Sequence, residues 1–222
     1  MPAADFNAVA LPDAVGFVEA AVLGCRMATS FRALAHADQG AVQEGERVVV
    51  YGCGGVGLSA VLVAKALGAE VVAVDLEEAG VEAALALGAD EGVCGDYGGE
   101  ADVTLDAVGS AGVLVAALEC LKPRGRHVQV GLLAGADAGP RVPMGRVIAK
   151  ELRVVGSHGM AAARYPEMLA MVADGRLPVG KLVGRRIGLD EVGEALVGMG
   201  GNGGSGGVAV WESSKKLTSW KG

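Results

Sequence analysis

The residues with the clearest chemistry are glycines spaced as G-x-G-x-x-G in positions 52–57. In a turn of this pattern, Gly52 allows the tight bend and Gly54 lets the backbone approach a pyrophosphate. Gly57 lets the following helix pack close to the preceding strand. Backbone N–H groups at the start of that helix would face the phosphate oxygens. The glycines therefore predict a turn that binds a dinucleotide.

The elements around this turn decide how specific the pattern is, because a G-x-G-x-x-G match alone is weak. The β-branched run 47–52 predicts a strand, and a helix is expected to begin at Gly55. Gly55 and Val56, the first residues of this helix, are expected to contact the cofactor together with the three glycines of the motif. A second predicted strand, 70–75, ends on Asp75, whose carboxylate can accept hydrogen bonds from the adenosine ribose hydroxyls. Strand, helix, strand and acid in this order make a dinucleotide site the favoured interpretation.

The charges near Asp75 indicate which dinucleotide is bound. Residues 66–121 contain no lysine or arginine, although twelve aspartates and glutamates fall in that window. NADP carries a 2′-phosphate that needs a cation, and Asp75, Glu77 and Glu78 would repel it. The sequence therefore predicts NAD as the cofactor.

Strand-like and helix-like segments alternate along the chain around the turn. The strands are expected at 47–52, 70–75, 92–94, 102–108, 127–131 and 152–156. The helices are expected at 55–67, 77–87, 111–121 and 143–149, the third of them stopped by Lys122-Pro123. This alternation predicts an α/β protein, with a doubly wound parallel six-stranded sheet of the Rossmann type and right-handed crossovers. Its ligand is expected at the carboxyl ends of the strands, where the strand order reverses.

Further elements flank the predicted sheet on both sides in sequence. Residues 12–45 carry a helical apolar pattern, and the segments after 160 predict an αβ tail. The tail consists of helices 166–173 and 189–199, an extended segment 181–187, a glycine-rich run 200–207 and a strand 208–211. The glycine-rich run could be a linker, but the strand that follows at once favours a flexible hairpin or loop.

The composition excludes several classes of partner. The 222 residues carry a net charge of −7 with a pI near 5.0, which argues against nucleic acid or an anionic membrane as partner. No secretory signal is visible, and no uncharged apolar run is long enough to span a bilayer. The four cysteines include no C-x-x-C pair, so a disulfide framework and a four-cysteine zinc lobe are both disfavoured. We expect a soluble protein of the reducing cytoplasm.

A set of motifs distributed along the chain resembles the zinc-dependent alcohol dehydrogenases of the medium-chain dehydrogenase/reductase superfamily. The motifs are Leu11-Pro-Asp, Leu23-Gly24-Cys25-Arg26 with Thr29, Gly45-Glu-Arg-Val-Val-Val, Gly52-Cys-Gly-Gly-Val-Gly-Leu58, Leu87-Gly-Ala-Asp90, Gly156-Ser-His-Gly159 and Leu189-Asp-Glu-Val. The resemblance extends from Asp5 to Trp211. It implies hydride transfer between NAD and a small alcohol or carbonyl substrate.

The resemblance covers one half of such an enzyme. The family's barrel-like amino-terminal catalytic domain has no counterpart in these residues, and with it the first cysteine ligand and the His-Glu pair of the zinc site are missing. Residues 1–20 would be the remnant of the link from that domain, 21–177 the NAD-binding domain, and 178–222 a tail that packs on the missing domain. We therefore expect the chain to bind NAD but to be inactive as this fragment.

The resemblance also assigns roles to individual residues. Cys25 matches the remaining ligand of the catalytic zinc, which would be bound only in a complete enzyme, and Thr29 matches a residue that packs on the nicotinamide. The other matched positions contact the cofactor. They are Asp75 and Leu76 at the adenosine ribose, Ala107 and Val108 on the adenine side, and Val130, Gly131, Leu132, Gly156 and Ser157 around the nicotinamide carboxamide.

Several polar residues have a simpler interpretation than catalysis. His127, in an apolar strand, is expected in the core, whereas His36 is expected on the surface. For His158, near the expected cofactor mouth, a role as proton relay is not favoured. Asp106 is expected to make structural hydrogen bonds, and Cys53 to be a small residue of the turn.

Two other functional classes stay open at this point. One is a zinc-free reductase of the same superfamily, similar to quinone or enoyl reductases. The other is a non-catalytic NAD-binding interaction module. In every case the predicted strand 152–156 lies at the sheet edge, and an unpaired β-branched edge favours self-association into a homo-oligomer.

Overall fold

The computed structural model describes residues 7–198 and 208–211, and its centre is a six-stranded parallel sheet. The strand order is β3-β2-β1-β4-β5-β6, which confirms the predicted doubly wound sheet. The strands are β1 (Arg47–Tyr51), β2 (Glu70–Asp75), β3 (Glu91–Cys94), β4 (Ala101–Asp106), β5 (Leu121–Gln129) and β6 (Arg153–Gly156).

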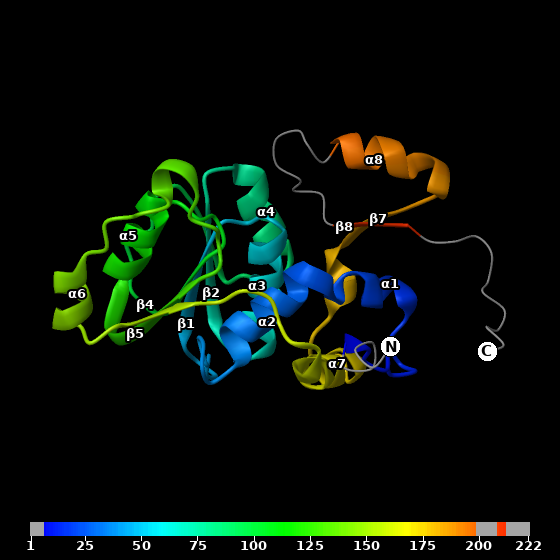
Figure 1. The fold of residues 1–222 in the computed structure, drawn as a ribbon, viewed down its shortest axis with the longest axis horizontal. Helices are drawn as coiled ribbons and strands as arrows, with labels where there is room; N and C mark the ends of the chain where they lie inside the picture. The colour runs from blue at the N-terminus through cyan, green and yellow to red at the C-terminus, as the bar shows by residue number, and fades with distance from the viewer. Residues whose placement is uncertain (1–6, 199–207, 212–222) are drawn as a thin grey trace.

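Helices cover both faces of this sheet. The helices that connect its strands are α3 (Gly55–Ala66), α4 (Glu78–Ala86), α5 (Ala111–Glu119) and α6 (Met144–Ala149). Figure 1 shows α5 and α6 on one side of the sheet, and α3 and α4 on the other side together with α2 (Ala28–Ala35). The strand order reverses between β1 and β4, and such a reversal leaves a crevice at the carboxyl ends of these two strands.

Alternate residues of the central strands supply two separate cores. In β1, Val48 and Val50 are buried on the side of α3, whereas Val49 and Tyr51 are buried on the side of α5. This alternation follows from the two-residue period of a strand, and both faces are apolar because both are covered.

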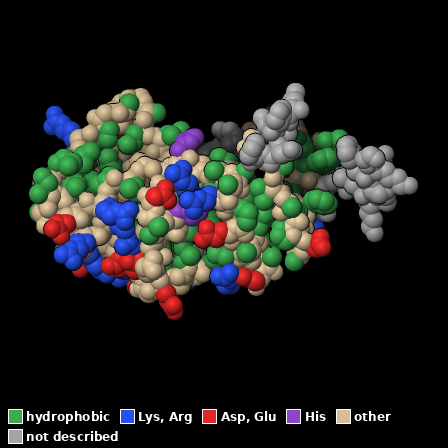
Figure 2. All heavy atoms as spheres, turned by 60° about the horizontal axis from the view of Figure 1, so that its bottom comes forward, with side chains coloured by type: hydrophobic (Ala, Val, Ile, Leu, Met, Phe, Trp, Pro, Cys, Tyr) green, Lys and Arg blue, Asp and Glu red, His purple; other side chains and the backbone are tan. Residues whose placement is uncertain are grey.

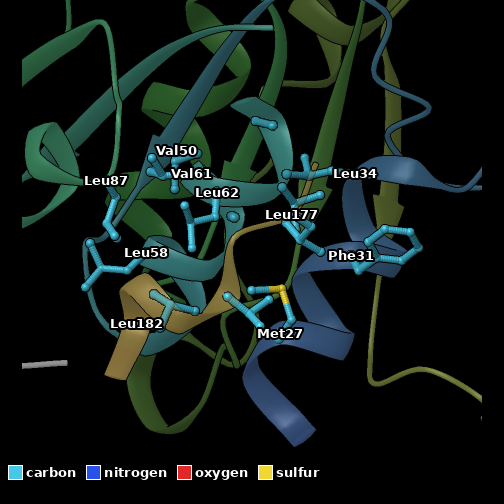
Figure 3. Close-up of a cluster of buried hydrophobic side chains, with 14 of the residues drawn as sticks. Met27, Phe31, Leu34, Val50, Leu58, Val61, Leu62, Leu87, Leu177 and Leu182 are labelled. Carbon is cyan, nitrogen blue, oxygen red and sulfur yellow. The ribbon is translucent and has the colours of Figure 1, made fainter. Parts of the chain in front are cut away.

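The larger core also includes the segments outside the sheet. Met27, Phe31 and Leu34 belong to one buried cluster with Leu177, Leu182 and side chains of α3, and Figure 3 labels these residues. The helices that carry this contact are α1 (Phe17–Ala21), a π-helical turn (Leu23–Met27), α2 and α7 (Tyr165–Ala173). Short 3₁₀ turns occur at Gly135–Asp137, Ala162–Arg164, Val179–Leu182 and Leu189–Glu191. The divisions at 20/21 and 177/178 stay predictions.

The carboxy-terminal elements form a second, small sheet. β7 (Val183–Ile187) pairs with β8 (Val208–Trp211) in parallel, and α8 (Val192–Gly198) lies between them in sequence. Of the two expected alternatives, a hairpin or a loop, the parallel pairing excludes a hairpin between β7 and β8, because parallel neighbours need a crossover connection, which α8 begins. The glycine-rich run 200–207 itself lies outside the described residues. Figure 1 shows this sheet at the end of the molecule opposite to α6.

The start of β5 also corrects the sequence prediction. The helix expected to run to residue 121 ends at Glu119, and β5 begins at Leu121 and passes through Lys122-Pro123. Leu121 pairs with Ala101, after which the register shifts. An irregular strand start tolerates the missing N–H of proline. Lys122-Pro123 was interpreted only as the end of a helix, although proline is also compatible with the start of a strand.

Figure 2 shows lysine and arginine side chains next to aspartates and glutamates on the face that it presents. Within the described ranges, none of the helices combines the length and the apolar character that a bilayer crossing requires.

Candidate functional site

The glycine turn lies between the end of β1 and the start of α3, as predicted. Gly52 has φ +90°, a left-handed conformation that favours glycine, and a Cβ on Gly57 would collide with the carbonyl oxygen of Gly52. The first intrahelical bond of α3 runs from Leu58 N to Gly54 O at 2.8 Å. No side chain caps this helix, so its first N–H groups are available to an anion.

Asp75 ties this turn to the end of β2. One carboxylate oxygen accepts from Cys53 N at 2.5 Å, and the other accepts from Glu77 N at 2.9 Å. Each oxygen keeps a further acceptor position, which can serve a ribose hydroxyl. Burial and the Asp75 charge raise the pKa of the Cys53 thiol to about 12, so that side chain is a neutral, small neighbour of the turn.

A cleft of about 980 Å³ opens beside the turn. Its described lining contains four carboxylates and no lysine or arginine; the carboxylates belong to Asp75, Glu77, Asp96 and Glu119. Apolar and small side chains from the ends of β1 and β4 and from α5 form its other wall. The structure brings six of the predicted cofactor residues together here: Gly52, Gly54, Asp75, Leu76, Ala107 and Val108.

A buried carboxylate shapes the adjoining end of β4. Asp106 is fully buried and accepts hydrogen bonds from Val108 N at 2.7 Å and Gly109 N at 2.8 Å. Gln129 Nε2 donates to its other oxygen at 2.8 Å. Asp106 therefore makes the structural hydrogen bonds that were expected, and it holds the backbone at the cleft wall next to the end of β5.

The same network continues into the core through His127. Its Nδ1 lies 2.9 Å from Thr104 Oγ1, and its Nε2 lies 3.1 Å from Gln129 Oε1. Burial lowers the pKa of His127, so the imidazole is held neutral as a satisfied core residue. Sequence reasoning missed Thr104 and Gln129. A signal for them was present in the sequence: on each of the apolar strands β4 and β5, two polar residues lie two positions apart, so they share one face of the sheet. The pairs are Thr104 with Asp106, and His127 with Gln129.

The residues predicted to hold the nicotinamide lie at the ends of β5 and β6, outside the cleft. Gly131 N donates to Asp106 O at 2.7 Å, and Ser157 N donates to Gln129 O at 2.9 Å. Ser157 Oγ is buried without a hydrogen-bond partner in the described structure. Thr29 is buried in α2, whereas Leu132 is 74% exposed and Gly156 is exposed. A Cβ on Gly131 would be 2.6 Å from the carbonyl carbon of Val108, which lines the cleft, so the carboxyl end of β5 adjoins the cleft.

The candidate metal ligand is exposed and isolated. Cys25 lies in the π-helical turn Leu23–Met27, and no group of three potential ligands occurs among the described residues. Those residues alone therefore do not assemble a zinc site. His36 corrects a prediction, since it is buried rather than on the surface; its Nε2 lies 3.8 Å from Glu167 Oε2, and burial lowers its pKa.

Comparison with known proteins identifies the family. The family described as zinc-binding dehydrogenase matches residues 55–174, more than half of the chain. The chain belongs to the zinc-binding dehydrogenase family. This match confirms the resemblance drawn from the motifs, and the fold is that of the family's cofactor-binding half.

The curated relatives of this chain are named as dehydrogenases and reductases. A sorbitol dehydrogenase of Bombyx mori is 30% identical over 168 residues, which are 68% of this chain and 47% of the relative. An alcohol dehydrogenase of Geobacillus stearothermophilus is 46% identical over 88 residues, 40% of this chain and 25% of the relative. The chain spans about half the length of the first curated relatives that it matches.

Solved dehydrogenase structures share the fold. Acetophenone reductase from Geotrichum candidum, solved in complex with NAD, superposes with a TM-score of 0.77 at 25% identity, covering 91% of this chain and 58% of that one. An alcohol dehydrogenase from Thermus sp. ATN1 gives 0.73 at 29% identity, covering 84% and 57%.

Proposed function

We propose that this dehydrogenase chain binds NAD as the cofactor-binding portion of a zinc-dependent alcohol dehydrogenase-like oxidoreductase. The observation that carries the proposal is the cleft beside the glycine turn, with the Asp75 carboxylate at the end of β2 and uncapped N–H groups at the start of α3. When bound, NAD supplies the carbon that accepts a hydride from an alcohol or, as NADH, returns it to an aldehyde or ketone.

The chain should prefer NAD to NADP. Asp75, Glu77 and Asp96 line the cleft where the adenosine ribose would lie, and a 2′-phosphate there would meet these carboxylates without a cation in the described lining. The Asp75 carboxylate instead accepts from the 2′- and 3′-hydroxyls of NAD.

Fluorescence titration of the chain with NADH and with NADPH at matched salt tests this preference. We expect NADH to bind at least about tenfold more tightly, and Asp75→Ser to narrow the difference. Glu151→Gln is the control, because it removes a charge from an exposed side chain outside the cleft lining. Equal dissociation constants for the two cofactors in the unmutated chain would sink the proposal.

For the reacting end we propose that Thr29 packs on the nicotinamide and that backbone at 130–132 and 156–157 holds the carboxamide. Cys25 would be one ligand of a zinc ion whose other ligands come from outside the described residues. A three-ligand site is the minimum that a catalytic zinc requires, so the chain alone should oxidise no simple alcohol, with or without added zinc. Aldehyde reduction at ordinary enzyme rates with stoichiometric zinc would contradict the assignment of Cys25.

We further propose self-association through the sheet edge. β6 is the edge strand, with Val154 44% exposed, and the neighbouring α6 exposes Met144 and Ile148 at 53% and 73%. Edge pairing about a two-fold axis would cover these apolar side chains. Sedimentation at tens of micromolar, as an order of magnitude, should then show a dimer or larger species. A monomer at that concentration would count against the edge interface.

A further inference from the structure

Arg26 lies directly on the glycine turn. A Cβ built on Gly55 would be 2.5 Å from Arg26 Cδ and 2.7 Å from both Nε and Nη1. The guanidinium group therefore occupies the space immediately outside the first residue of α3. Gly55 is the residue whose missing side chain leaves room for it.

The local structure fixes this placement. Gly24 has a non-helical ψ of −140° inside the π-helical turn, which buries Leu23 and Met27 and leaves Arg26 exposed between them. Ser30 Oγ lies 3.0 Å from the carbonyl oxygen of Arg26 and 2.8 Å from that of Val56, so its hydroxyl proton can bond either one. The turn that carries Arg26 is thereby tied to the first turn of α3.

The charges of the site show what this arginine can do. The described lining of the cleft holds four carboxylates and no cation, yet a dinucleotide brings a diphosphate with two negative charges to the glycine turn. Within the described part of the chain, no carboxylate forms an ion pair with Arg26. Its guanidinium is therefore available, and a planar fork of N–H donors suits phosphate oxygens.

We propose that Arg26 binds the diphosphate of the dinucleotide beside the first N–H groups of α3, against which its guanidinium already lies. This inference rests on the proposed NAD site and deepens it. The helix N–H groups orient the phosphates, and Arg26 supplies the positive charge that offsets the repulsion from the carboxylates of the cleft.

Paired ligands test the role of the charge. ADP carries the diphosphate and adenosine does not, so each is titrated into the full chain and into Arg26→Gln by NMR chemical-shift mapping. We expect Arg26→Gln to weaken ADP binding roughly tenfold to a hundredfold, the range for a lost charge-assisted hydrogen bond, and adenosine binding less than about twofold. The salt dependence of ADP affinity should also decrease. Equal effects on the two ligands, or none on either, would overturn the proposal.

Two further variants keep the test sharp. Arg26→Lys retains the positive charge and should bind ADP more tightly than Arg26→Gln; the reverse order would also overturn the proposal. Arg124→Gln is the matched control. Arg124 lies near the start of β5, at the ends of the strands opposite to the glycine turn, and its side chain is 84% exposed. Failure of the unmutated chain to bind ADP or NADH would instead reject the NAD site itself. Equal thermal midpoints of the variants exclude misfolding as the cause.

Discussion

The two ends of the parallel sheet carry their charges in different ways. At the amino ends of the strands, cations and carboxylates are paired; the pairs are Arg47–Glu91, Lys122–Asp102, Arg126–Glu46 and Lys65–Asp90. At the carboxyl ends, the cleft collects the carboxylates of Asp75, Glu77 and Asp96 without a cation in its described lining. The paired charges at the amino ends neutralise one another and need no ligand. The carboxylates of the cleft and the uncapped N–H groups at the start of α3 lack such partners, as expected of groups that bind a ligand.

This difference separates the groups expected to stabilise the fold from those expected to bind the cofactor. The amino ends of the strands are called the amino edge below, and their carboxyl ends the carboxyl edge. Substitutions at the amino edge should change the free energy of unfolding and leave cofactor affinity unchanged. Substitutions at the carboxyl edge should change affinity, and should affect stability only where they alter packing. The position of the cleft at the point where the strand order reverses follows the general rule for open α/β sheets.

Gly57→Ala should give the largest effect, because it disturbs packing and binding together. A Cβ at this position would collide with the carbonyl oxygen of Gly52, so α3 must shift away from β1. We expect a loss of about 3 kcal/mol in the free energy of unfolding, the upper range for overpacking, and NADH binding too weak to measure. Urea denaturation and fluorescence titration provide the two readouts.

Gly54→Ala separates the two effects at the same turn. A Cβ on Gly54 meets nothing within 4 Å, and its backbone, with φ −76°, suits alanine. Stability should therefore stay within about 0.5 kcal/mol, while NADH binding weakens because the methyl group lies where the phosphates approach. Unchanged NADH affinity would show that the phosphates do not approach this part of the turn.

Asp102→Asn tests the amino edge. Asp102 accepts from Lys122 Nζ at 2.8 Å and from Arg47 N at 2.9 Å. We expect a loss of about 1–2 kcal/mol in the free energy of unfolding and no change in the NADH dissociation constant beyond about twofold. A large change in NADH affinity would break the separation between the two edges.

The pH dependence sharpens this test. Burial works to raise the pKa of Asp102, but the Lys122 ammonium and the Arg47 N–H outweigh it, and the net shift is below the usual 3.8. The stabilisation is thus fully present above that value and is lost as pH falls through the lower, folded-state pKa. Unfolding measured at pH 7 and under strongly acidic conditions should show the difference between Asp102→Asn and the unmutated chain disappearing in acid.

Much of the fold around the glycine turn could be predicted from the sequence. The β-branched run 47–52, the glycine spacing and Asp75 have local signals, and they placed the turn, the sheet and the cleft edge correctly. Periodicity of apolar residues also predicted the helices on both faces, because each must bury one stripe against the sheet.

The remaining features depend on contacts between distant segments. The position of Arg26 against Gly55 requires the π-helical turn, which has no sequence signal of its own. Gln129 and Thr104 join Asp106 and His127 only through the register of β4 and β5, which single-chain patterns do not fix. The parallel pairing of β7 and β8 was missed for the same reason, since a glycine-rich run suggests a hairpin unless the crossover is known.

His127→Asn should give a smaller effect that depends on pH. Burial lowers the pKa of His127 below its ordinary 6.5, so in the folded state the imidazole takes up a proton less readily than in the unfolded chain. The unmutated chain should therefore lose stability as pH falls below about 6.5, and the loss should level off below the folded-state pKa. Asparagine can still accept from Thr104 Oγ1, and the variant should show a smaller slope between neutral pH and pH 5, since burial also lowers the pKa of His36, which keeps its share. An unchanged slope in urea unfolding would show that another group titrates.

Arg124→Gln should give the smallest effect of the series. Arg124 Nε donates to Glu151 Oε2 at 3.1 Å, but the side chains are 84% and 71% exposed, so water competes for both charges. Exposed pairs of this kind contribute from nothing to about 1 kcal/mol, and here we expect less than about 0.5 kcal/mol. NADH affinity should be unchanged, because the pair lies at the edge of the sheet away from the glycine turn. A loss approaching that of Asp102→Asn would show that exposure does not govern how much the amino-edge pairs stabilise the fold. The comparison between the edges would then have to rest on binding alone.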